Sequence, residues 1–299
     1  MARIHANGIE IEYEEFGPNT GTPILLIMGL GAQLTRWPLE FIEILTSRGY
    51  RVIRYDNRDV GLSQKFDSAG PADLVKMMTE LAEGKKASAA YTLEDMENDA
   101  AGLLDALRIE KAHIVGASLG GAIGQLVAAN HPGKTLSFTS IMSSTGNSAL
   151  PPAKPEAMAV ILNRPPAGDL EATIEAAVKA SKTIGSPGFP SDEKEIRRRV
   201  AEDFKRSNYP AGFSRQAAAA LVNGDRRAAL KRIKVPTLVI HGADDPLVPI
   251  EGGRDTAANI AGAELIEIPG MGHDLPAALY SNIVDAIESV AKRARVGSS

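Results

Sequence analysis

The sequence predicts an α/β protein with a mostly parallel, doubly wound sheet of about eight strands and a helical segment inserted after the sixth strand. Short apolar runs alternate with stretches of helical periodicity, a pattern typical of parallel strands buried on both faces by crossover helices. The alternation stops over residues 145–225 and then resumes. The chain has 299 residues, 44% of them hydrophobic, which is sufficient for one large core.

The first elements are two strands joined by a tight turn. Asn7-Gly8 is the strongest short hairpin signal, and it is flanked by the strand-like runs 3–5 and 9–16. A buried strand, a helix and another buried strand are predicted next, over residues 24–28, 37–48 and 51–56. The polar, Lys-rich interval 67–90 predicts a loop or short helices.

The middle of the chain repeats the strand-helix pattern. Thr92 and Asp95 have the spacing of a capping box, and the apolar residues behind them fall on one helical face: Leu93, Met96, Ala100, Leu103, Leu104 and Leu107. A strand, a helix and a strand follow over residues 112–115, 119–130 and 136–142.

The inserted segment contains helical stretches and no convincing strand. Its predicted helices cover residues 170–182, 192–207 and 214–222. Beyond it we expect a strand over 237–240, a helix near 252–260, a strand over 264–268 and a closing helix over about 276–293. We therefore expect an α/β core formed by residues 1–144 and 226–299, interrupted by a helical cap at 145–225.

Composition excludes several classes of function. Because the chain has no Cys, it has no disulfide, thiolate metal ligand or cysteine nucleophile. The net charge, 33 − 37 = −4, gives no basic patch for nucleic acid. The amino terminus alternates Ile with Glu, unlike a signal peptide, and the longest apolar run, residues 23–32, is broken by Gly and too short to span a bilayer. We expect a cytoplasmic monomer or homodimer with no nucleic-acid or membrane partner.

Ser118 is the candidate nucleophile. Gly116-Ala117-Ser118-Leu119-Gly120 matches GxSxG, and it lies where a predicted strand ends and a predicted helix begins. A sharp turn at this point exposes the serine hydroxyl. It also places the N–H groups and positive dipole end of the helix beside a developing oxyanion.

His273 is the candidate base for this serine. A serine hydroxyl needs a base, usually His, and in a doubly wound sheet the triad follows the order Ser, acid, His on loops after strands. Only His273 follows Ser118 in a loop directly after a late strand. The other four histidines lie within elements or at their ends: His5, His113, His131 and His241.

Two adjacent residues compete for the role of the triad acid. Asp244 and Asp245 both follow the strand over residues 237–240. Asp245 precedes Pro246, which restrains its backbone to an extended conformation, whereas Asp244 suits capping of the turn after Gly242. We favour Asp245 and keep Asp244 as the alternative.

With these residues in place, the chain resembles the α/β-hydrolase family. Five blocks carry the resemblance over nearly the whole chain outside the insertion: Met28-Gly29 with its strand, residues 55–63 (YDNRDVGLS), the GASLGG elbow, residues 235–246, and Gly270-Met271-Gly272-His273. The blocks look most similar to the anthracycline (aclacinomycin) methylesterase branch, in which Met-Gly stands in the oxyanion loop and Arg-Asp follows the fourth strand.

The resemblance implies the α/β-hydrolase fold and a serine carboxylesterase that needs neither cofactor nor metal. In this family the last Asp of a GxxDP block is the triad acid, which matches Asp245. Most relatives have His-Gly where this chain has Met28-Gly29. Because the oxyanion hole uses backbone N–H groups, Leu30 and Leu119 can still supply it. The implied chemistry is acyl transfer to serine followed by hydrolysis.

The expected substrate is a small-to-medium ester with a short alcohol part, such as a methyl ester of a bulky acid. Gly29, Trp37, Met142 and Leu247 are candidate pocket residues, although a core role suits Trp37 equally well. Apolar residues of the insertion are either further pocket walls or cap core: Met158, Ile161, Leu162, Phe204, Tyr209, Phe213 and Leu221. A lactone, an amide, a C–C bond or perhydrolysis is the alternative for the same triad.

Two other classes compete with the enzyme interpretation. Gly29-Leu30-Gly31 after a strand, with Asp56 ending the next strand, imitates a dinucleotide fingerprint, but the third glycine is replaced by Leu34. Asp56 and Arg58 are therefore interpreted as structural. A non-catalytic hydrolase-like binding protein is the other class, which the complete set of triad residues disfavours. No HExxH or other metal-ligand spacing is present.

Overall fold

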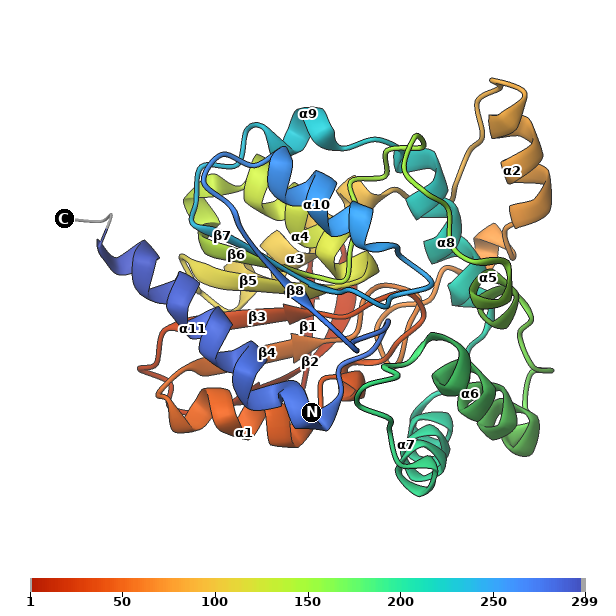
Figure 1. Ribbon diagram of the computed structural model, residues 1–299, viewed down its shortest axis with the longest axis horizontal. Helices are drawn as coiled ribbons and strands as arrows, with labels where there is room; N and C mark the ends of the chain where they lie inside the picture. The colour runs from red at the N-terminus through yellow and green to blue at the C-terminus, as the bar shows by residue number, and fades with distance from the viewer. Residues whose placement is uncertain (1, 297–299) are drawn as a thin grey trace.

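One eight-stranded sheet runs through the computed structural model, which describes residues 2–296 (Figure 1). Its strand order is β1-β2-β4-β3-β5-β6-β7-β8. The strands are β1 Ala2–Ala6, β2 Ile9–Phe16, β3 Pro23–Ile27, β4 Arg51–Tyr55, β5 Ala112–Ala117, β6 Thr135–Ile141, β7 Thr237–Gly242 and β8 Glu264–Ile268. The pairs β1–β2 and β2–β4 are antiparallel and all others are parallel, so the predicted mostly parallel sheet is confirmed. Asn7 and Gly8 form the expected two-residue turn between Ala6 and Ile9.

Helices cover both faces of this sheet (Figure 1). One face packs against α1 Leu39–Ser47 and α11 Tyr280–Val296, and the other against α3 Leu93–Ala106, α4 Leu119–Asn130, α9 Arg227–Leu230 and α10 Ile250–Ala258. The sequence of strand β3 is a continuous apolar run because both of its faces are buried. Leu25 and Ile27 pack into the α3–α4 side, whereas Ile24 and Leu26 pack into the α1–α11 side. The capping box predicted at Thr92 and Asp95 is present at the start of α3.

Several helix boundaries differ from the prediction for local reasons. The helix predicted over 37–48 begins at Leu39, because Pro38 lacks an N–H and holds Trp37 in an extended conformation after the short 3₁₀ turn Leu34–Arg36. The polar interval contains the nine-residue helix α2 Leu74–Ala82, capped by Asp73. A further helix, α5 Pro155–Leu162, was not predicted; it starts at a proline in its first turn, which is favourable there.

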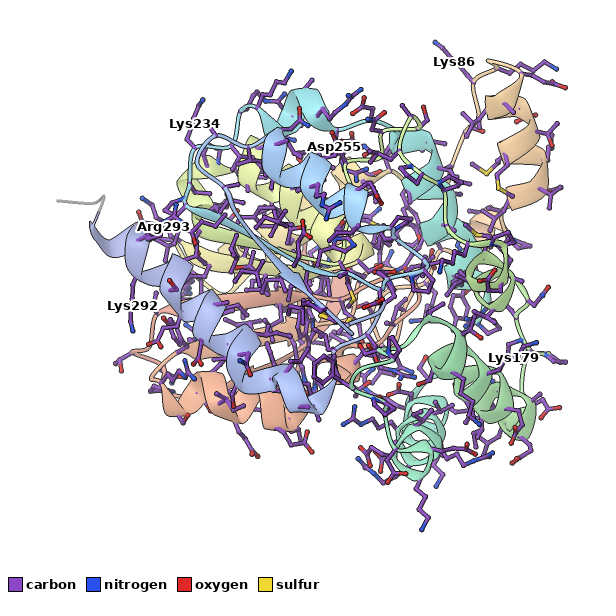
Figure 2. All side chains as sticks on the ribbon, in the orientation of Figure 1. Lys86, Lys179, Lys234, Asp255, Lys292 and Arg293 are labelled. Carbon is purple, nitrogen blue, oxygen red and sulfur yellow. The ribbon has the colours of Figure 1, made fainter. Side chains whose placement is uncertain are left out.

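Five helices lie between β6 and β7 in the chain, and the first four of them sit at the end of the sheet toward which the parallel strands point (Figure 1). These four are α5, α6 Leu170–Ile184, α7 Glu193–Arg206 and α8 Ala211–Asn223. Charged side chains such as Lys86, Lys179 and Lys292 extend outward from the surface (Figure 2). Within residues 2–296, no helix has both the length and the apolar character required to cross a membrane.

Candidate active site

Ser118 lies at a strained turn between β5 and α4. Its backbone φ of 55° and ψ of −120° fall outside the regions that non-glycine residues favour. The neighbouring glycines make the turn possible: a Cβ atom on Gly116 would overlap the carbonyl group of Gly120, and one on Gly120 would overlap that of Ile27. The GxSxG spacing therefore follows from how closely β5, α4 and β3 approach one another.

Ser118, His273 and Asp245 are brought together by loops that are distant in sequence. His273 Nε2 lies 3.0 Å from Ser118 Oγ, and His273 Nδ1 lies 2.7 Å from Asp245 Oδ2. The other carboxylate oxygen of Asp245 accepts hydrogen bonds from the backbone N–H groups of Leu247 and Val248, at 2.9 and 2.8 Å. With the Asp245 carboxylate ionised, Nδ1 of His273 carries the proton, and Nε2 is left to accept one from the serine hydroxyl.

Asp244 has a different position. Its side chain accepts a hydrogen bond of 2.6 Å from the backbone N–H of Gly270, at the start of the loop that carries His273. Asp244 is exposed, whereas Asp245 is buried. The structure thus brings Asp245 to the histidine, while Asp244 ties two loops together.

A second histidine stands beside the triad carboxylate. His241, at the end of β7, is fully buried, and its Nε2 is 2.8 Å from the carbonyl oxygen of Val248 and 3.7 Å from Asp245 Oδ2. Burial lowers the pKa of His241. A neutral ring that donates its Nε2–H to Val248 holds the turn whose N–H groups bind Asp245.

The backbone N–H groups of the two predicted oxyanion donors, Leu30 and Leu119, are not used in hydrogen bonds among the described residues, 2–296. Leu119 directly follows Ser118 in the chain, and Leu30 follows Gly29, which packs against Ser118. The turn that carries Leu30 is fixed by Gln216 of α8, whose Oε1 accepts from the Gly31 N–H at 2.8 Å. Gln216 also donates to the carbonyl oxygen of Arg58, at 2.7 Å. No local sequence pattern identified Gln216.

Asp56 and Arg58 have the structural roles expected of them. The Asp56 carboxylate accepts hydrogen bonds of 2.8 Å from the N–H groups of Leu34 and Leu62 and forms an ion pair with Arg206 of α7. Arg58 forms a two-pronged pair with Asp99 of α3. Asp56 is fully buried by these contacts, so it is not placed to bind a nucleotide ribose.

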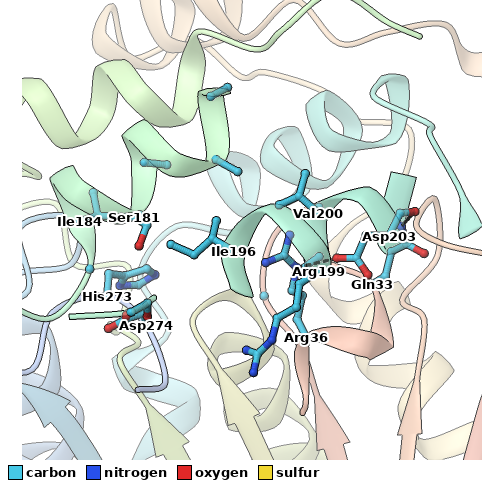
Figure 3. A pocket seen from close by; sticks show the side chains of 18 of the residues that line it. Gln33, Arg36, Ser181, Ile184, Ile196, Arg199, Val200, Asp203, His273 and Asp274 are labelled. Carbon is cyan, nitrogen blue, oxygen red and sulfur yellow. Dashed lines mark hydrogen bonds and ion pairs between the residues drawn. The ribbon is translucent and has the colours of Figure 1, made fainter. Parts of the chain in front are cut away.

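A cavity of about 900 Å³ opens above Ser118 and His273, between the sheet and the inserted helices (Figure 3). Of the predicted pocket residues, Gly29, Met142 and Leu247 line it. Trp37 does not: its side chain is fully buried beside Phe41, because the extended backbone before Pro38 directs it into the core under α1. Of the apolar residues considered in the insertion, the lining ones are Ile161, Phe204, Tyr209 and Phe213.

The connection between α6 and α7 supports the histidine loop. The His273 backbone N–H donates to the carbonyl oxygen of Ile184 at 2.6 Å, and the Gly272 N–H donates to Ser186 Oγ at 2.9 Å. The Ser186 hydroxyl in turn donates to Asp274, whose pKa is raised by burial. Sequence reasoning missed Ser186, because its contact depends on how the insertion folds back. Between residues 2 and 296, no three or more His, Asp or Glu side chains are grouped so as to hold a metal ion.

Comparison with known proteins defines the class of this molecule. Residues 22–276 match the α/β hydrolase fold family. The chain therefore belongs to the α/β-hydrolase family of enzymes, as its motifs and its sheet predicted.

The relatives found by sequence point to one branch of that family. The chain is 31% identical over 295 residues to rhodomycin D methylesterase of Streptomyces sp. (strain C5), covering 92% of each chain. It is 29% identical over 296 residues to rhodomycin D methylesterase of Streptomyces peucetius, again covering 92% of each. The predicted resemblance to anthracycline methylesterases is confirmed.

Solved structures confirm the fold. The meta-cleavage product hydrolase of Pseudomonas fluorescens IP01 superposes with a TM-score of 0.70 at 22% identity, covering 98% of this chain and 96% of that one. The enol-lactonase of Burkholderia xenovorans gives a TM-score of 0.66 at 24% identity, covering 100% of both chains.

Proposed function

We propose that this chain hydrolyses carboxylic esters with Ser118 as nucleophile, His273 as general base and Asp245 as the acid that orients the histidine. The observation that carries the proposal is the continuous hydrogen-bonded chain from Asp245 through His273 to Ser118 Oγ, at 2.7 and 3.0 Å. This is the arrangement that raises the reactivity of a serine hydroxyl at neutral pH.

The reaction then has two halves. His273 Nε2 takes the hydroxyl proton as Ser118 Oγ attacks the ester carbonyl carbon, and the Leu30 and Leu119 N–H groups stabilise the resulting oxyanion. Collapse of this intermediate breaks the bond to the alcohol oxygen, which leaves with the proton held by His273. Water, deprotonated by His273, attacks the acyl-enzyme in the same way and releases the acid.

The cavity and the relatives support a proposal for the substrate class. We propose an ester with a short alcohol part, such as the methyl ester of a bulky acid. A space of about 900 Å³ accommodates a large acyl group. The two methylesterase relatives support a small alcohol. Residues 145–225 would form the lid over this space, and residues 1–144 and 226–299 the catalytic core.

Turnover of p-nitrophenyl acetate or butyrate tests the reaction. Ser118→Ala should lower kcat by about 10⁶-fold, because it removes the nucleophile of a cooperating triad. The wild-type protein should gain the mass of one organophosphate adduct on Ser118. Retained turnover in the variant, or no turnover and no labelling of the wild type, would overturn the assignment. An unchanged thermal unfolding temperature controls for folding.

A substrate series tests the ester class separately. Methyl, ethyl and butyl esters of acids of increasing size should show the highest kcat/KM for the methyl series. Lactones, amides, C–C substrates and perhydrolysis assays are run in parallel. Higher kcat/KM for any of these would replace the ester assignment while leaving the triad in place.

A further inference from the structure

Arg164 is a cation without a counter-ion on the wall of the active-site cavity. It lies in the connection between α5 and α6 and lines the cavity together with Asn163 and Pro165. Its guanidinium carbon is 4.5 Å from the ring centroid of Phe213, over which it is stacked. Among the side chains that the structure describes, none forms a hydrogen bond or ion pair with this guanidinium, and the residue as a whole is exposed. Its five N–H donors are therefore available to a ligand.

The carboxylates that line the same cavity are already engaged with other partners. Asp203 accepts from Arg36 and Thr35, at 2.7 and 2.5 Å. The remaining acidic groups have their own donors: Glu195 pairs with Arg198 and Arg199, Asp274 accepts from Ser186, and Asp192 accepts from the Lys194 N–H. None of them neutralises Arg164.

A second arginine adds to the positive charge near Arg164. Arg36 lines the cavity and uses Nε to bind Asp203, as Figure 3 shows on the side of the cavity opposite His273 and Asp274. Partial desolvation of the side chain, and after it the Arg36 cation, lowers the pKa of Arg164. Both effects disfavour the arginine cation, and the opposite charge of a bound anion would offset them.

Arg164 and the turn that carries Leu30, called the oxyanion turn below, pack against the same aromatic ring, that of Phe213. Phe213, which carries Arg164 on its face, packs against Gly31: a Cβ atom on Gly31 would come within 2.8 Å of ring carbon Cδ2. Gly31 directly follows Leu30, the predicted oxyanion donor. One aromatic ring therefore separates the guanidinium from the turn that would hold the ester carbonyl oxygen.

We propose that Arg164, assisted by Arg36, binds an ionised carboxylate on the acyl part of the substrate. The inference rests on the proposed ester hydrolysis and narrows its substrate class to half-esters, in which one carboxyl is esterified and a second is free. A guanidinium suits this group because its planar donors match the two oxygens of a carboxylate.

A series of monomethyl esters of linear dicarboxylic acids, from malonate to sebacate, tests the proposal against the corresponding dimethyl esters. Arg164→Gln should lower kcat/KM for the best half-ester by about 10- to 100-fold, because a charge-assisted hydrogen bond is lost. It should leave hydrolysis of the dimethyl ester nearly unchanged. The wild-type preference for the half-ester should weaken as salt is added.

Lys179→Gln is the matched control. It removes one positive charge from the outer face of α6 (Figure 2), and Lys179 does not line the cavity, so both substrate classes should be hydrolysed as by the wild type. If Arg164→Gln lowers kcat/KM equally for both ester classes, or for neither, the carboxylate site is refuted.

Binding without turnover separates this proposal from the proposed function. Calorimetry compares the Ser118→Ala variant with the Ser118→Ala, Arg164→Gln double variant, with monomethyl adipate or the best half-ester of the series as ligand. The single variant should bind this ligand about 10-fold more tightly. Equal affinities would refute the carboxylate site. If the affinities differ while the wild type hydrolyses no ester, the reaction assignment fails and the anion site stands.

Discussion

At the scale of single residues, the site depends on positions that are held against their local preferences. Ser118 keeps a left-handed φ of 55° in a non-glycine residue, a conformation that costs about 1–3 kcal/mol. The surrounding β5–α4 packing maintains it. Asp245 is buried as a carboxylate, and three N–H groups surround it, two from the backbone and one from His273. Burial of an anion is tolerated when its oxygens are satisfied in this way.

The two neighbouring aspartates should differ strongly in their effect on catalysis. In Asp245→Asn, the amide oxygen still accepts from the Leu247 and Val248 N–H groups, so the amide NH₂ faces His273. Nδ1 of His273 must then accept a hydrogen bond, the ring proton moves to Nε2, and Nε2 can no longer accept the proton of Ser118. We expect kcat to fall by roughly 10³- to 10⁴-fold. Asp244→Asn retains an acceptor for Gly270 and should change kcat by less than about 3-fold, because only a surface contact is altered. Steady-state kinetics with p-nitrophenyl butyrate compare the two. The acid assignment is lost if Asp244→Asn proves the more damaging.

The site residues that could be predicted have local sequence patterns, whereas those that could not be predicted are defined by contacts in three dimensions. Ser118 and His273 each follow the end of a strand, and the carboxyl ends of parallel strands share one edge, so local pattern and chain order predict them, whereas the choice between Asp244 and Asp245 stayed open. Gln216 and Ser186 contact the core from the insertion, whereas Arg164 packs on Phe213 within the insertion. Those contacts have no periodicity or motif, so only the three-dimensional structure identifies these residues.

At the scale of elements, α8 connects the inserted helices to the catalytic loops. Arg215 forms a buried two-pronged pair with Asp59 in the loop after β4, at 2.8 Å for each bond. The next residue, Gln216, spans the Gly31 N–H and the Arg58 carbonyl oxygen. This helix therefore fixes both the loop after β3 and the loop after β4.

Replacing Gln216 tests its effect on the oxyanion turn. Gln216→Leu preserves most of the side-chain volume but leaves the Gly31 N–H and the Arg58 carbonyl without partners, a penalty of about 1–3 kcal/mol for each group. We expect kcat to fall about 10-fold with KM little changed, because the Leu30 N–H is less well aligned in the transition state. Gln216→Glu keeps an acceptor for Gly31 and should recover part of kcat. Unchanged kcat in Gln216→Leu would show that the turn is held without this side chain.

The sheet and its flanking helices were predictable because β3, β5 and β7 are buried on both faces and therefore appear as continuous apolar runs. The unpredicted helix α5 has only one buried residue, Ala157. Amphipathic periodicity is weak in such a helix, so it left no clear pattern in the sequence.

At the scale of the whole molecule, a buried carboxyl couples stability to pH. Glu97 lies between α3 and α4, where its two oxygens accept from Asn130 at 2.8 and 3.0 Å. Burial raises its pKa from 4.5 to about 7, despite the opposing effect of Asn130. Between those two pH values the unfolded chain loses this proton while the folded chain keeps it, so stability falls as pH rises.

Glu97→Gln should remove this pH dependence. The difference between the folded and unfolded pKa values of Glu97, about 7 and 4.5, lowers the free energy of unfolding by about 3 kcal/mol at pH 8 and has no effect below pH 4.5. The free energy of unfolding of the variant should therefore exceed that of the wild type at pH 8, with the gap closing toward pH 5. Urea denaturation at several pH values measures it. Glu110→Gln, an exposed change, provides the control. A gap that does not vary with pH would contradict the role assigned to Glu97.

The attachment of the inserted helices has a kinetic consequence. Gln33, which follows the oxyanion turn, donates to the carbonyl oxygens of Asp203 and Ser207 at the end of α7, and Gly31 is held by α8. Any movement that lifts these two helices from the sheet withdraws the supports of the oxyanion turn. If substrate enters or leaves by movement of α7 and α8, the protein cannot exchange substrate and stabilise the transition state at the same time. Each catalytic cycle that used this route would have to reassemble the site before chemistry, and its rate would be bounded by how fast the helices return.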